Sequence, residues 1–113
     1  MRYFLLGAAP LAAMLAGAAL ADEPVRLQMT IRDHRFQPDV LRVPANRPLV
    51  IEVRNEDPTA EEFESADLGV EKVIAGKRQL PVRVRPLAPG RYAFIGEYHS
   101  DTARGTIIAE TAP

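Results

Sequence analysis

The fold is decided by residues 92–107, which read Tyr-Ala-Phe-Ile-Gly-Glu-Tyr-His-Ser-Asp-Thr-Ala-Arg-Gly-Thr-Ile. Tyr92 and Phe94 fall on alternate positions, a period typical of a strand with one buried face. Residues 106–109 predict a last strand, because they are apolar and rich in β-branched side chains. The sequence therefore predicts two strands joined by a polar loop at 96–101.

Further short segments upstream share this pattern. They alternate in polarity or are β-branched, and Pro, Gly and Asn punctuate them. The predicted strands are 27–31, 40–43, 49–53, 63–68, 70–74 and 80–87. A helix over 59–66 has little support, because Pro58 precedes it and its apolar residues are scattered. The chain is thus predicted to be all-β, a Greek-key β-sandwich of seven or eight strands.

The composition excludes several classes of function and of metal site. The chain has 113 residues, which is enough for one domain, and its 47% hydrophobic content is enough for a packed core. Its 14 basic residues against 15 acidic ones argue against a nucleic-acid binder, which needs a basic face. The chain has no Cys, which excludes disulfides, zinc–thiolate sites, iron–sulfur clusters and copper–thiolate centres.

The first 21 residues have the layout of a secretory signal peptide. Arg2 gives a positive start, residues 4–18 are apolar, and Ala19-Leu20-Ala21 places small residues before a cleavage point. This predicts a signal peptide over 1–21 and one domain over 22–113. The style of the signal is bacterial, so the expected location is the periplasm.

Two loops carry candidate metal ligands. The first, 55–64, holds five acids, which are Glu56, Asp57, Glu61, Glu62 and Glu64. In the second loop, Glu97, His99 and Asp101 would share one face if the segment were extended. Carboxylate oxygen and imidazole nitrogen suit Cu(II), Zn, Fe or Mn.

The second loop resembles the last loop of the cupredoxins, the small copper β-sandwiches. The resemblance rests on Tyr92-x-Phe94-x-Gly96-Glu97-Tyr98-His99, with a Gly at 105 leading into the final strand. The family loop carries Cys, then His three residues on, then Met. Gly96 stands at the Cys position, His99 at the His position, and Ala103 near the Met position.

Upstream segments extend the resemblance. Phe36-x-Pro38-x2-Leu41-x-Val43-Pro44-Ala45 is similar to the second strand and turn of the family. Asn55 followed by Glu61-Glu62-Phe63 stands where the family has Asn, its first His ligand and an apolar residue. The first His is thus replaced by an acid, and a blue-copper thiolate site is not expected.

The acid-rich version resembles a narrower branch, the EfeO-type cupredoxin-like domains of bacterial periplasmic iron-uptake systems. The segments that carry this likeness are 62–64, 70–73 and 96–103. The resemblance implies copper (Cu2+) or iron as the bound metal. It also implies a membrane iron permease or a periplasmic iron-binding protein as partner, and a role in oxidising or handing over ferrous iron.

The strongest ligand candidate is His99, which alone retains a ligand position of the family. Glu62 is the second candidate, but Glu61 competes with it, because a slip of one residue in register swaps the inward side chain. Glu97 is the third candidate. Outer groups that orient these ligands are expected at Glu64 and Asp101.

His34 is a further candidate, since it precedes Phe36 and could approach the same end of the sandwich. An exposed histidine at a strand edge is the alternative for this position.

Two functions follow. The first is a periplasmic metal-binding protein that assists ferrous iron uptake, with an accessory ferrous-iron oxidase as one form of it. The second is a metal-free interaction module, in which Glu61, Glu62, Glu97 and Asp101 form an acidic patch that docks a basic partner.

Overall fold

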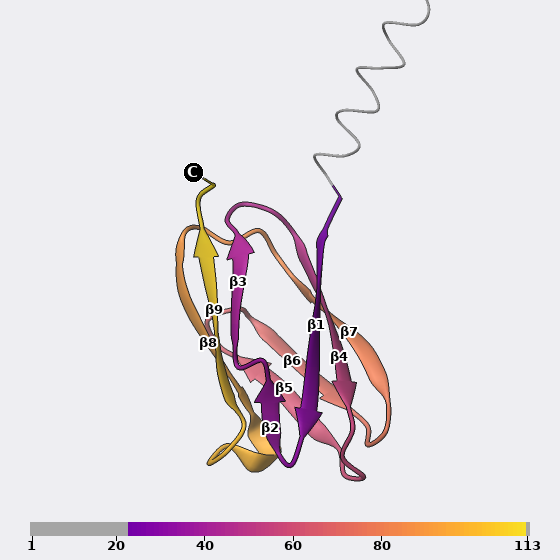
Figure 1. The fold of residues 1–113 in the computed structure, drawn as a ribbon. Coiled ribbons are helices and arrows are strands. Elements are labelled where there is room, and N and C mark those ends of the chain that lie inside the picture. Colours follow the sequence, from indigo (N-terminus) through magenta and orange to yellow (C-terminus); the bar gives the residue numbers. More distant parts are fainter. Residues whose placement is uncertain (1–22, 113) are drawn as a thin grey trace, which may run out of the picture.

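The structure is a computed structural model that describes residues 23–112. Within these residues, nine strands form two sheets that face each other, which confirms the predicted all-β sandwich (Figure 1). The strands are β1 (Val25–Arg32), β2 (Arg35–Gln37), β3 (Val40–Pro44), β4 (Leu49–Asn55), β5 (Glu61–Ser65), β6 (Val70–Ile74), β7 (Gln79–Val84), β8 (Gly90–Gly96) and β9 (Arg104–Glu110). The signal peptide predicted over 1–21 lies outside the described residues.

The sheets are mixed. One has the order β2-β1-β4-β7, with β1 and β4 parallel, and the other has the order β3-β9-β8-β5-β6, with β3 and β9 parallel. The remaining neighbours in both sheets are antiparallel. A parallel pair needs a crossover connection between its two strands. The chain makes the crossover from β1 to β4 through β3, which belongs to the other sheet.

The observed elements differ from the prediction chiefly at four places. The strand predicted over 80–87 ends at Val84. The strand predicted over 63–68 begins at Glu61 and ends at Ser65, and the helical alternative for 59–66 is wrong. Strand β2 was not predicted, because three residues are too few to show a period. The loop after β8 is a short 3-10 helix, η1 (Glu97–His99), rather than an extended segment.

The core under the loop end is built on three phenylalanines. Phe63 and Phe94 stack with ring centroids 4.9 Å apart, and Phe36 meets Phe94 edge-on at 5.1 Å. Gly105 makes this possible, since a Cβ there would lie 2.3 Å from the Phe94 ring. This cluster ties β2, β5 and β8 together, and so fixes the loops at their ends.

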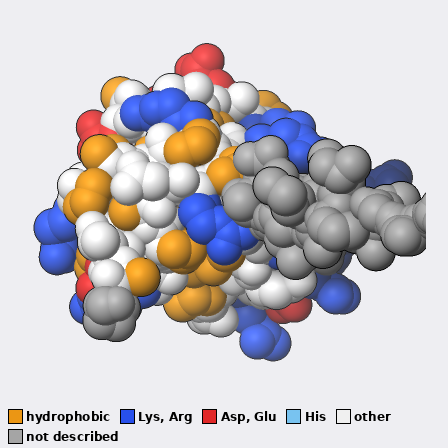
Figure 2. All heavy atoms as spheres, turned by 90° about the horizontal axis from the view of Figure 1, so that it is seen from above, with side chains coloured by type: hydrophobic (Ala, Val, Ile, Leu, Met, Phe, Trp, Pro, Cys, Tyr) orange, Lys and Arg blue, Asp and Glu red, His pale blue; other side chains and the backbone are white. Residues whose placement is uncertain are grey.

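The end of the sandwich near the β1–β2 turn carries both histidines. Figure 1 shows this turn and η1 at the bottom of the molecule. Figure 2 views the opposite end, where Lys and Arg side chains are scattered among apolar ones and no histidine is visible. Within residues 23–112 no helix is long and apolar enough to cross a membrane.

Candidate metal centre

The orientation of β5 decides which acid faces inward. Phe63 is fully buried, and a strand places side chains two residues apart on the same face. Glu61 therefore shares the inward face with Phe63 and is 1% exposed, whereas Glu62 and Glu64 lie on the outer face. The acid of β5 that faces inward is Glu61, not Glu62.

Both oxygens of the buried Glu61 carboxylate have hydrogen-bond partners. Its Oε1 accepts hydrogen bonds from the backbone N–H groups of Glu62 (3.0 Å) and Tyr98 (2.9 Å). Its Oε2 lies 2.5 Å from His99 Nδ1, a contact that requires one proton between the two atoms. The side chain of His99 is 25% exposed, so the pair reaches from the core to the surface.

Gly96 leaves the space that this carboxylate fills. A Cβ at Gly96 would lie 2.6 Å from Ala103 Cβ, 2.7 Å from Glu61 Cδ and 2.9 Å from Glu61 Oε1. The Glu61 carboxylate thus stands against the backbone position where the resemblance would put a thiolate. A copper–thiolate site does not fit this chain, whereas a metal with oxygen and nitrogen ligands suits the donors present.

His34 reaches the same place from the first sheet. Its ring stacks on that of His99, with centroids 3.5 Å apart and planes inclined by 12°. Asp33 and His34 form the two-residue turn between β1 and β2, both with positive φ (53° and 58°). The structure therefore brings together three of the predicted residues, Glu61, His99 and His34.

The carboxylate of Asp57 holds this turn. It accepts hydrogen bonds from the backbone N–H groups of Asp33 (2.8 Å) and His34 (3.0 Å). Burial alone would raise the pKa of Asp57, but these hydrogen bonds and the attraction that His34 and His99 exert in their protonated forms hold it below its usual range. Asn55 fixes Asp57 in turn, because its Oδ1 accepts from the Asp57 N–H at 3.0 Å.

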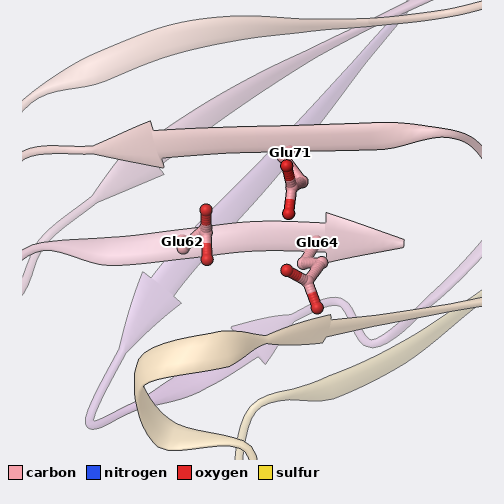
Figure 3. Close-up of side chains that lie close together, drawn as sticks. All are labelled: Glu62, Glu64 and Glu71. Carbon is pink, nitrogen blue, oxygen red and sulfur yellow. The ribbon is translucent and has the colours of Figure 1, made fainter. Parts of the chain in front are cut away.

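A second group of acids lies on the outer face of β5 and β6. Glu62, Glu64 and Glu71 present carboxylate oxygens within 4.8 Å of one another (Figure 3). Loss of solvation, a hydrogen bond with Glu71 and the negative charges of Glu97 and Glu62 raise the pKa of Glu64 to about 7. We call Glu62, Glu64, Glu71 and Glu97 the acidic cluster.

The structure separates the predicted residues into two groups. Glu62, Glu64 and Glu97 belong to the acidic cluster rather than to the Glu61–His99 pair, and Asp101 is exposed in the turn after η1. Glu97, His99 and Asp101 would share one face only in an extended segment, and this condition is not met, because Glu97 and His99 lie in a 3-10 helix.

Two residues near the site were missed by sequence reasoning. Asp57 was only one of several loop acids, although a two-residue Asp33-His34 turn signals backbone N–H groups that need an acceptor. Glu71 lies directly opposite Glu64 in the β5–β6 ladder, and only the strand register reveals this proximity.

Comparisons with known proteins agree with this architecture. A family described as "Cupredoxin-like domain" matches residues 4–109. The chain is 39% identical over 87 residues to "Uncharacterized protein RP394" of Rickettsia prowazekii (strain Madrid E), a match that covers 77% of this chain and 70% of that protein.

Solved structures show the same fold at low identity. Auracyanin A, a "blue" copper protein from Chloroflexus aurantiacus, superposes with a TM-score of 0.66 at 15% identity, covering 78% of this chain and all of that one. The metal-binding domain of the Cu(I)-exporting P-type ATPase CopA of Streptococcus pneumoniae D39 gives 0.67 at 15% identity, covering 79% and 97%. At this identity the likeness shows the fold alone.

Proposed function

The chain belongs to the cupredoxin-like domain family, and from this premise we propose that it binds a copper or iron ion at Glu61 and His99 and assists ferrous iron uptake in the periplasm. The observation that carries the proposal is the buried Glu61 carboxylate in contact with His99 Nδ1. The fold commonly holds a metal at its loop end, and this pair is a carboxylate–imidazole donor set at that end.

The pair needs only a small adjustment to hold an ion. Two ligands bonded at about 2.1 Å and roughly at right angles to each other lie about 3 Å apart. Glu61 Oε2 and His99 Nδ1 are 2.5 Å apart, so they must separate by about half an ångström as the shared proton leaves. Glu61 is fixed by its two backbone hydrogen bonds, whereas His99 is partly exposed and can move.

Delivery of iron is the favoured form of this role. Carboxylate oxygen stabilises Cu(II) over Cu(I), which makes a copper ion at this site a weak oxidant. The oxidase form would require one bound Cu(II) to take one electron from one Fe(II), giving Cu(I) and Fe(III). Expected partners are a membrane iron permease or a periplasmic iron-binding protein, which would receive the ion.

The test is a metal titration of the purified protein. Calorimetry with Cu(II), and with Fe(II) under anaerobic conditions, should give one-to-one binding that Glu61→Gln and His99→Ala weaken at least about tenfold. Glu64→Gln/Glu71→Gln is the matched control, because it removes two carboxylates from the acidic cluster and none from the pair. Equal affinity in wild type, Glu61→Gln and His99→Ala would overturn the proposal.

Two further readouts address the biological role. Cells carrying His99→Ala should take up less ferrous iron than wild-type cells at limiting iron. If Fe(II) abolishes the EPR signal of the Cu(II)-loaded protein, the oxidase form replaces delivery.

The metal-free alternative has a different signature. The predicted patch of Glu61, Glu62, Glu97 and Asp101 loses Glu61, which is 1% exposed, so a basic partner would dock on the acidic cluster instead. That binding would weaken as the salt concentration rises and would be insensitive to chelators.

A further inference from the structure

We infer that His34 is a direct metal ligand, so that Glu61, His99 and His34 form a site of two imidazoles and one carboxylate. This inference rests on the proposed metal binding at Glu61 and His99, and it assigns the third donor. It is carried by the position of the His34 ring, by the backbone that holds it there, and by the ring nitrogens that it leaves free.

The position of the ring places a donor beside the pair. The His34 and His99 rings are nearly parallel with centroids 3.5 Å apart. Nitrogen atoms that bind one metal are separated by about 3 Å, given metal–nitrogen bonds of about 2.0–2.1 Å. The donor atoms of Glu61, His99 and His34 do not all lie within 4.8 Å of one another, because stacked rings keep their in-plane lone pairs in separate planes. The His34 ring must therefore rotate out of the stack to bring a nitrogen to an ion held by Glu61 and His99.

Hydrogen bonds hold the backbone of His34 in this position. Two-residue hairpin turns with positive φ at both residues favour Asn-Gly, and a histidine there is an unusual choice. The Asp57 carboxylate accepts the N–H groups of both turn residues, and Thr102 Oγ1 donates to the His34 carbonyl at 2.6 Å. Residues held in sparsely populated conformations cluster at functional sites, and here two independent contacts hold one.

The ring nitrogens of His34 are free to bind. Among residues 23–112, neither of them has a hydrogen-bond partner in the protein, although the backbone of the same residue is bonded on both sides. A histidine that served only to cap a neighbouring group would use a ring nitrogen for that purpose. The His34 ring instead offers its face to His99 and keeps its lone pair available.

The resulting donor set points to the kind of metal. Two imidazoles and one carboxylate leave open coordination positions and are typical of non-haem Fe(II) sites, and they also suit Cu(II). Open positions allow an acceptor protein to take hold of the ion before it is released. A site of this composition would therefore exchange iron more readily than a closed four-ligand site.

The experiment counts imidazoles on Cu(II), used as a spectroscopic probe. Pulsed EPR of the Cu(II)-loaded wild-type protein should show two coordinated imidazoles, and His34→Phe should show one. Phenylalanine keeps a flat ring against His99 and removes both nitrogens, so the variant separates ligation from stacking. Cu(II) and Fe(II) affinities should fall about tenfold or more in His34→Phe, and thermal unfolding should confirm that it is folded.

The outcomes separate the two proposals. A single imidazole in both proteins, with unchanged affinity, would overturn the role of His34 and leave metal binding at Glu61 and His99 intact. A wild-type protein that binds neither Cu(II) nor Fe(II) would overturn the proposed function and this inference with it. Loss of affinity in His34→Ala but not in His34→Phe would also overturn ligation, because it would assign only a packing role.

Discussion

Gly96→Ala tests whether the Glu61 carboxylate occupies the space beside β8. The added methyl would lie within 3.0 Å of Ala103 Cβ, Glu61 Cδ and Glu61 Oε1. The backbone cannot easily yield, since the Gly96 N–H donates to the Ala103 carbonyl at 2.9 Å. Overpacking of this kind costs about 1–3 kcal/mol, and we expect about 2 kcal/mol, which lowers the Tm by roughly 8–16 °C for a domain of this size.

A double-mutant cycle isolates the cause. Glu61→Ala removes two of the three close atoms, so Gly96→Ala should cost at least about 1 kcal/mol less in that background than in wild type. Urea unfolding followed by circular dichroism measures all four proteins. If the two substitutions are additive within about 0.5 kcal/mol, the carboxylate does not fill this space and the account of the thiolate position is refuted.

Three more substitutions probe the surroundings of the site. Asp57→Asn should lower the free energy of unfolding by about 1–3 kcal/mol at pH 7. Because the pKa of Asp57 is lowered in the folded protein, its contribution to stability is present above the unfolded pKa and is lost as the pH falls through the folded pKa. Urea unfolding should therefore show a smaller difference between wild type and variant at pH 3 than at pH 7. Glu64 should titrate in NMR with a midpoint near 7, and Glu71→Gln should lower that midpoint, because a neutral amide replaces the carboxylate whose hydrogen bond stabilises protonated Glu64. Since the pKa of Glu64 is raised in the folded protein, its contribution to stability is full below the unfolded pKa and is lost as the pH rises through about 7. An unchanged midpoint would contradict the described contacts. Asn55→Ala should cost about 2–4 kcal/mol in urea unfolding, because it leaves the Asp57 N–H and the Thr59 and Ile74 carbonyls without their partner; a loss below about 1 kcal/mol would contradict this role.

Much of the fold could be predicted from local pattern. Alternation around Met29, Val82 and Phe94 identified strands whose inward residues are indeed buried. Strand β2 could not be predicted, because its three residues are too few to show a period. It is stabilised by the tertiary contacts of the Phe36 ring with the rings of Phe63 and Phe94.

The candidate site was only partly predictable. His99 and the lost thiolate position were found from the last loop and its resemblance. The choice between Glu61 and Glu62 was within reach, since burial of Phe63 also implies burial of the residue two positions earlier. Sequence reasoning proposed that His34 could approach this end of the sandwich, but its stacking on His99 was not predictable, because contacts between the two sheets are not encoded locally. The position of Glu71 opposite Glu64 was not predictable either, because it depends on the β5–β6 register.

The sequence by itself determined an all-β chain, because period two in polarity requires strands with one buried face. It also determined that no thiolate can bind a metal, because the chain has no Cys. Only the tertiary structure decided that Glu61 meets His99, that His34 stacks on His99, and that Glu62, Glu64 and Glu71 gather on the outer face of the β5–β6 pair. These contacts join segments far apart in the chain, and the packing of the two sheets, rather than any local preference, sets their distances.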